Sequence, residues 1–133
     1  MGMPYELNVF SQTRQAGQDL STKQYYFVTL NSSGQVILPT ATTDVPYGIL
    51  QNKPGSLQAA LVMRIGVSRL VLGGSIITGA NNVGTDAAGK GTLFAAGVAG
   101  TAGYPVGYME EGADAANSIG AVAINCINPK RAF

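Results

Sequence analysis

One short stretch of the sequence has the residue types and spacing of a site that does chemistry. It is VGTDAAGKGT, residues 83 to 92, in which Gly84, Gly89 and Lys90 are spaced as in a phosphate-binding loop. In such a loop, glycine amides surround the phosphates and the lysine contacts the outer ones. The residue after the lysine should be Ser or Thr to hold magnesium, but Gly91 stands there.

The residues that follow this stretch disfavour a phosphate site. A phosphate-binding loop opens a helix whose N-terminus faces the anion. Gly97, Gly100 and Gly103 follow instead, and each glycine costs a helix roughly 1 kcal/mol relative to alanine. The pattern therefore favours a polar turn between two strands, with Asp86 and Gly89 as turn residues.

Carboxylates cluster at one place only, in the stretch EEGADAANS that contains Glu110, Glu111 and Asp114. A calcium site is one alternative, but the spacing is not that of an EF-hand loop. A pair of catalytic carboxylates is another alternative, and no feature of the sequence indicates a substrate cleft beside it. We interpret the stretch as a solvated loop between strands.

Histidine is absent, which removes the commonest general base and the commonest metal ligand. Cys126 is the only cysteine and lies in AVAINCIN, on the same side of an alternating strand as Val122 and Ile124. We expect a buried small hydrophobic side chain there rather than a reactive thiol. The sequence predicts no enzyme, no catalytic residue, no cofactor and no metal site.

The composition indicates a surface that a partner covers. Only 11% of the 133 residues are charged and the net charge is +1, against about 25% charged residues in a typical domain. Charge depletion is typical of the cores of interfaces; the alternative is a monomer with an uncharged polar surface. The eight Lys and Arg are spread along the chain, which argues against nucleic-acid binding. No apolar run reaches the length of a membrane span.

Short strands separated by turn residues are predicted from residue 23 onward, as in a β-sandwich or β-barrel. The longest alternating segment is LQAALVMRIGVSRLVL, residues 57 to 72, and Gly66 within it indicates a bulge or tight turn. A short helix at residues 92–100 or 112–118 is an open alternative to irregular structure.

Residues 1–22 differ from the rest of the chain, and we predict an arm and linker there, followed by one β-domain over residues 23–133. Tyr5, Leu7 and Val9 alternate as in a strand with one buried face, and residues 11–19 are polar and read as linker. The arm either adds a strand to a partner outside its own domain or is the first strand of the domain's own sheet.

Several short elements occur in a fixed order over roughly residues 25 to 127. They are Pro46, Gly48, Ile49 and Leu50; Asn52 and Pro54; Val62 and Gly66; Gly74, Ile77 and Gly79; Asp86, Gly89 and Lys90; and Val106, Gly107 and Glu111. Their order resembles that of the capsid decoration, or cement, proteins of tailed bacteriophages. In that family the element at Asp86 to Lys90 is a turn between strands.

The resemblance implies a small all-β barrel of the β-tulip type with an extended N-terminal arm, assembled as a homotrimer. It implies a structural virion protein on the outer surface of a mature capsid, bound to the major capsid protein at three-fold and quasi-three-fold points. There it would stabilise the head against the pressure of packed DNA, without catalysis. We infer that the arm contacts the capsid. The candidate residues are Met3, Pro4, Tyr5, Leu7, Val9 and Phe10.

An alternative of a different class is a β-sandwich binding module of a head fibre or tail that contacts host glycans. Exposed aromatic side chains would favour it. The candidates are Tyr5, Tyr25, Tyr26, Tyr47, Tyr104 and Tyr108.

Overall fold

The computed structural model describes residues 6–94 and 103–129, and this part of the chain contains strands and no helix. The expected all-β fold class is confirmed. The strands are β1 (Leu7–Gln15), β2 (Phe27–Leu30), β3 (Val36–Ile37), β4 (Gly48–Leu50), β5 (Ala59–Val71), β6 (Val83–Thr85), β7 (Gly91–Leu93), β8 (Gly107–Glu111) and β9 (Ile119–Asn125). In the described part of the chain, no helix is long and apolar enough to cross a membrane.

The nine strands form a single antiparallel sheet that curls strongly on itself. Its order is β3-β2-β4-β5-β9-β8-β6-β7, with β1 paired to β5 beside this path. The curl brings strands that are far apart in the sheet order close together. The amide of Phe27 in β2, for example, donates to the carbonyl of Gly89, between β6 and β7, at 2.7 Å. The result is a half-barrel, and the more specific tulip type stays a prediction.

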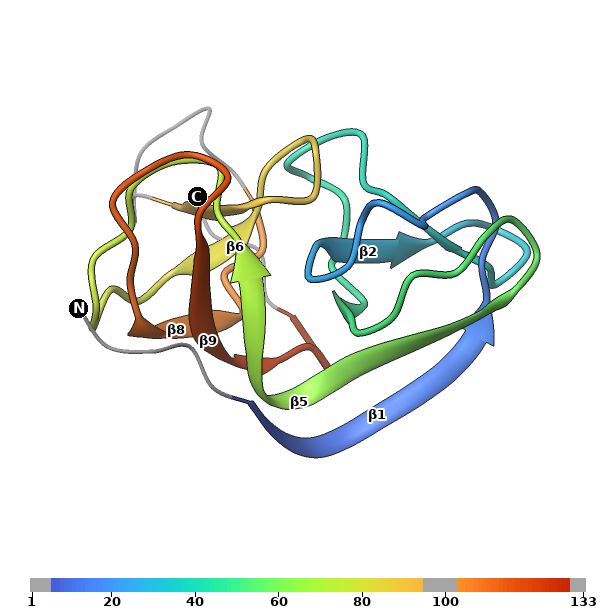
Figure 1. Ribbon diagram of the computed structural model, residues 1–133, viewed down its shortest axis with the longest axis horizontal. Coiled ribbons are helices and arrows are strands. Elements are labelled where there is room, and N and C mark those ends of the chain that lie inside the picture. Colours follow the sequence, from blue (N-terminus) through green and yellow to red (C-terminus); the bar gives the residue numbers. More distant parts are fainter. Residues whose placement is uncertain (1–5, 95–102, 130–133) are drawn as a thin grey trace.

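Strand β5 is the longest strand, and Figure 1 shows it running from one side of the molecule to the middle and bending sharply there. Val67 pairs with Leu7 of β1 and also with Ala123 of β9, so β1 and β9 lie on opposite edges of β5. Met63 pairs with Ile49 of β4 on the edge that carries β9. Two short partners therefore share one edge of β5, while β1 covers most of the other.

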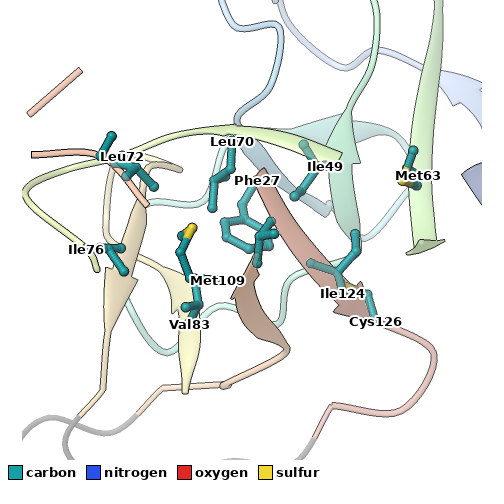
Figure 2. Close-up of a cluster of buried hydrophobic side chains, with 12 residues drawn as sticks. Phe27, Ile49, Met63, Leu70, Leu72, Ile76, Val83, Met109, Ile124 and Cys126 are labelled. Atoms are coloured by element: carbon teal, nitrogen blue, oxygen red, sulfur yellow. The ribbon is translucent and has the colours of Figure 1, made fainter. Parts of the chain in front are cut away.

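Two hydrophobic clusters lie on either side of β5. The larger contains Phe27, Ile49, Met63, Leu70, Leu72, Ile76, Val83, Met109, Ala113, Val122, Ile124 and Cys126, most of which Figure 2 shows. The smaller contains Ala16, Leu20, Val28, Val36, Tyr47, Leu50, Ala60 and Val62. Because β5 contributes Met63 to one cluster and its neighbour Val62 to the other, both faces of the strand are buried at these two positions.

The sequence predicted a bulge or tight turn at Gly66, and the pairing of β1 with β5 is irregular there, because β1 carries an extra residue, Val9, opposite Gly66. The φ of Gly66 is 139°, and the register between β1 and β5 shifts opposite it, between Asn8 and Phe10. A side chain at this position would overlap the carbonyl oxygen of Leu7, so the close approach of β1 requires glycine.

The N-terminal segment pairs with the chain's own sheet. Residues Leu7 to Gln15 pair with Val67 to Ala59 of β5, so of the two alternatives for the arm the structure shows the first strand of the same sheet. The stretch predicted as linker, residues 11–19, continues β1 and then buries Ala16, which packs with Leu20 in the smaller cluster. The reason is the length of β5, whose edge would otherwise leave a long row of amides and carbonyls without partners.

The open helix alternative at residues 112–118 is not observed, because Ala113 forms a bridge with Ile76 and the following residues form a turn. The alternative at residues 92–100 lies largely outside the described residues.

Candidate interaction site

The phosphate-loop-like stretch forms a tight hairpin turn between β6 and β7. Gly84 pairs with Thr92, and Thr85 pairs with Gly91. The carboxylate of Asp86 accepts hydrogen bonds from the amides of Ala88 at 2.8 Å and Lys90 at 2.9 Å. The side chain of the turn thus occupies amides that a phosphate-binding loop would present to its ligand, and the predicted turn is confirmed.

The lysine of the same stretch, Lys90, forms a hydrogen bond within the protein. Lys90 Nζ donates to Asn117 Oδ1 at 2.6 Å, which links the turn to the loop before β9. Gly89 has a φ of 88°, a conformation that favours glycine. A strand, β7, follows the turn where a phosphate-binding loop would open a helix.

The acidic residues lie at one end of β8 and in the loop beyond it. Glu110 and Glu111 are the last residues of this strand, and Asp114 is exposed in the following turn. Two of the three carboxylates are therefore on a strand rather than in the predicted loop. Among the described residues, no three Asp, Glu or Cys side chains gather closely enough to hold a metal ion.

Cys126 lies in the larger hydrophobic cluster with Val122 and Ile124, as predicted. Its side chain is 1% exposed. Burial raises the pKa of this thiol from 9.0 to about 12, although the positive charge of Arg64 acts in the opposite direction. The group is a protonated thiol at neutral pH, which fits a packing role.

The described part of the predicted arm presents apolar side chains to solvent. Leu7 is 60% exposed, Val9 is 66% exposed and Phe10 is 40% exposed. Alternation predicted one buried face for this segment, but β1 packs no face against a cluster at these positions. Its outer edge has no strand beside it in the described structure. The other three candidates, Met3, Pro4 and Tyr5, lie outside the described residues.

A second site, which the sequence did not indicate, surrounds Tyr47. The guanidinium carbon of Arg64 lies 4.1 Å from the centroid of the Tyr47 ring, and that of Arg14 lies 5.5 Å from it. Arg14 Nε donates to the Tyr47 hydroxyl at 3.0 Å, and this hydroxyl donates to Gln12 Oε1 at 2.8 Å. Residues from β1, β5 and the segment before β4 therefore meet around one buried ring.

A hollow of about 260 Å³ opens beside this cluster. Arg64 and Tyr47 line it together with apolar residues, of which Val45 is 45% exposed and Ile127 is 46% exposed. Small-molecule sites usually measure about 300–1,000 Å³. The hollow is therefore slightly smaller than most small-molecule sites.

The comparisons with known proteins bear on the fold. No protein-family model matches the chain, and no curated protein matches it. A solved structure that is similar is that of the head fiber gp8.5 N base in bacteriophage phi29, with a TM-score of 0.63 and 15% sequence identity. The match covers 87% of this chain and 93% of that chain. At this identity the two share a fold, and the all-β architecture is thereby seen in a protein of a phage head.

Proposed function

We propose that this chain is a structural protein of a tailed-bacteriophage head, bound to the outer surface of the mature capsid. The observation that carries the proposal is the fold shared with a head-fibre base, which extends over 87% of the chain. The ordered sequence elements that resemble cement proteins support the same location by a separate route. Two kinds of phage head protein thus resemble the chain, a head-fibre base by fold and the cement proteins by sequence pattern.

The attachment that we propose is the one the sequence resemblance implies. A homotrimer sits at three-fold and quasi-three-fold points, contacts the major capsid protein and holds neighbouring subunits together against the pressure of packed DNA. Once one protomer is docked, the other two bind at high effective concentration, which strengthens a bridge without new kinds of contact. The low charge of the chain suits surfaces that are covered in such an assembly.

Strand β1 supplies the contact surface in this proposal. Three apolar side chains within four residues, Leu7, Val9 and Phe10, are exposed on a strand whose outer edge is open in the described structure. Exposed apolar groups next to an open strand edge are suited to pairing with another chain. We place the capsid contact there.

A second candidate function is the base of a head fibre, and the fold shared with gp8.5 of phi29 favours it. In that case the chain attaches a projecting fibre to the head instead of covering every three-fold point. A head-fibre protein that contacts host glycans would need exposed aromatic rings. Tyr47 is 8% exposed whereas Tyr108 is 48% exposed, so of these two rings Tyr108 is the one that a glycan could reach.

The test is the composition of purified particles. Heads from an infected lysate are banded on a density gradient, and the ratio of this chain to the major capsid protein is measured by quantitative mass spectrometry. A near-equal ratio supports decoration of every three-fold point, and a small fraction supports a fibre base. Absence of the chain from the heads would contradict both.

A further inference from the structure

Among the residues that the structure describes, the guanidinium of Arg64 has hydrogen-bond partners but no counter-ion. Its Nε donates to the carbonyl of Tyr47 at 3.0 Å, and its two terminal nitrogens donate to Gln12 Oε1 at 2.9 Å and to the carbonyl of Cys126 at 3.0 Å. All three acceptors are neutral. Because a guanidinium has five N–H groups, these three bonds leave two of its donors without an acceptor among the described residues.

Two other arginines of the described chain differ from Arg64 in their partners. Arg69, also on β5, lies 3.7 Å from a carboxylate oxygen of Glu6, and this is the one ion pair within the described residues. Arg14 lies on the same ring as Arg64 and donates to the Tyr47 hydroxyl and to the carbonyl of Gly34. Two positive charges therefore meet at Tyr47 with no carboxylate beside them in the described structure, an arrangement that favours an anion from outside.

The hollow beside Arg64 limits what that anion is. Its walls are largely apolar, with Leu30 and Pro46 set back from the surface and Val45 and Ile127 at the rim. A bare inorganic anion would leave these walls without a partner. A carboxylate next to an apolar group would satisfy both parts of the hollow. The carboxylate would pair with the guanidinium, and the apolar group would pack on the apolar walls.

We infer that the hollow over Arg64 receives an acidic side chain, together with an adjacent apolar one, from a partner protein. The identity of that partner as a protein of the phage head rests on the proposed function, whereas the chemistry of the site does not. The apolar part of the partner packs on Val45 and Ile127, and its carboxylate accepts hydrogen bonds from the two remaining donors of Arg64. None of Leu7, Val9 and Phe10 lines the hollow, so this contact gives the chain a second point of attachment.

A small amphipathic acid tests the chemistry without any capsid. We would titrate the full chain with 3-phenylpropionate and with the neutral 3-phenylpropanamide, and follow the Val45 and Ile127 methyl signals and the Arg64 Nε–H signal by NMR. The acid is expected to bind at least about tenfold more tightly than the amide, since a charge-assisted contact of about 1.4 kcal/mol gives this factor. Equal binding of both compounds, or no binding of the acid, would overturn the inference.

Variants separate the role of Arg64 from a general effect of charge. Arg64→Gln should abolish the preference for the acid, and Arg69→Gln, a matched loss of one arginine on the same strand, should keep it. Val45→Glu places a carboxylate at the rim without removing any hydrogen bond of Arg64, so it should block the acid even where Arg64→Gln folds poorly. A preference for the acid that survives in both Arg64→Gln and Val45→Glu would contradict the site.

Binding to heads then tests the partner. Arg64→Gln and Val45→Glu should each weaken binding to purified heads by about tenfold or more relative to Arg69→Gln. Equal head binding by these variants would show that the head does not use this hollow. Failure of the wild-type chain to bind heads would instead contradict the proposed function, while the titration with the acid would still decide the chemistry of the site.

Discussion

Gly66 occupies a backbone conformation that other residues rarely adopt, and β1 passes directly over it. Its φ is 139°, and an added Cβ would overlap the carbonyl of Leu7. We expect Gly66→Ala to lower the free energy of unfolding by about 1–3 kcal/mol, because the strain and the overlap act together. Urea denaturation measures the change.

Gly74 provides the matched control, since no atom lies within 4 Å of a Cβ built there. Gly74→Ala should change the free energy of unfolding by no more than about 0.5 kcal/mol. Equal losses from both substitutions would show that the position of Gly66 has no special requirement for glycine.

The buried thiol of Cys126 makes stability depend on pH in alkaline solution. Its pKa is raised from 9.0 to about 12, so above pH 9 the unfolded chain releases a proton that the folded chain retains. The stabilising effect is therefore complete below pH 9 and is lost as the pH rises toward 12, at about 1.4 kcal/mol per pH unit. Denaturation of the wild type and of Cys126→Ala across this range measures the difference.

Other groups titrate in the same range, but they contribute equally to both proteins. As the pH rises, the wild type should lose more unfolding free energy than Cys126→Ala does, so the stability of the wild type falls relative to that of the variant. A constant difference from pH 8 to pH 11 would contradict the pKa shift of the buried thiol.

Among the elements, β1 is the one whose described side chains lie mostly in solvent although its backbone is paired over most of its length. Such a strand is held by hydrogen bonds rather than by side-chain burial, which leaves its apolar side chains free for a partner. We expect the triple substitution of Leu7, Val9 and Phe10 by serine to weaken head binding by at least about tenfold, since each loses exposed apolar contact area. Co-sedimentation with purified heads measures the affinity.

Ile77 is a suitable control for this experiment, because it is 72% exposed and lies in the loop before β6. Ile77→Ser should leave head binding unchanged. If the triple variant binds heads as tightly as Ile77→Ser does, β1 is not the contact strand.

Much of each element could be predicted from the sequence, because strand propensity, turn residues and alternation are local. The turn at Asp86, the irregular pairing at Gly66 and the buried side of β9, which continues to Cys126, all follow from neighbouring residues. The local pattern did not decide which partner β1 takes, since an exposed strand with apolar residues suits the chain's own sheet and a foreign one equally well.

The cluster around Tyr47 shows what a local pattern cannot predict. Gln12 and Arg64 are 52 residues apart, and Arg14 and Tyr47 are 33 residues apart, yet each pair shares a hydrogen bond. Nothing near Arg14 or Arg64 in the sequence marks either residue, because their proximity arises only when β1 and β4 are placed around β5. Strand order, rather than strand identity, was the missing information.

For the whole molecule, the two hydrophobic clusters should unfold together because they share β5. We expect Phe27→Ala in the larger cluster to cost about 3–5 kcal/mol, and Leu50→Ala in the smaller to cost about 2–5 kcal/mol. Each should move one common transition, followed by far-UV circular dichroism and by tyrosine fluorescence. Two separate transitions in either variant would show that the clusters are independent.

The lengthwise pairing of β1 with β5 has a mechanical consequence. Eight Cα pairs join the two strands, and the hydrogen bonds of antiparallel strands lie perpendicular to the strand direction. Tension applied to β1 along its own axis is therefore shared as shear by the whole ladder, whereas tension across the axis opens the pairs one after another. A chain pulled through β1 therefore resists best when the force runs along the strand.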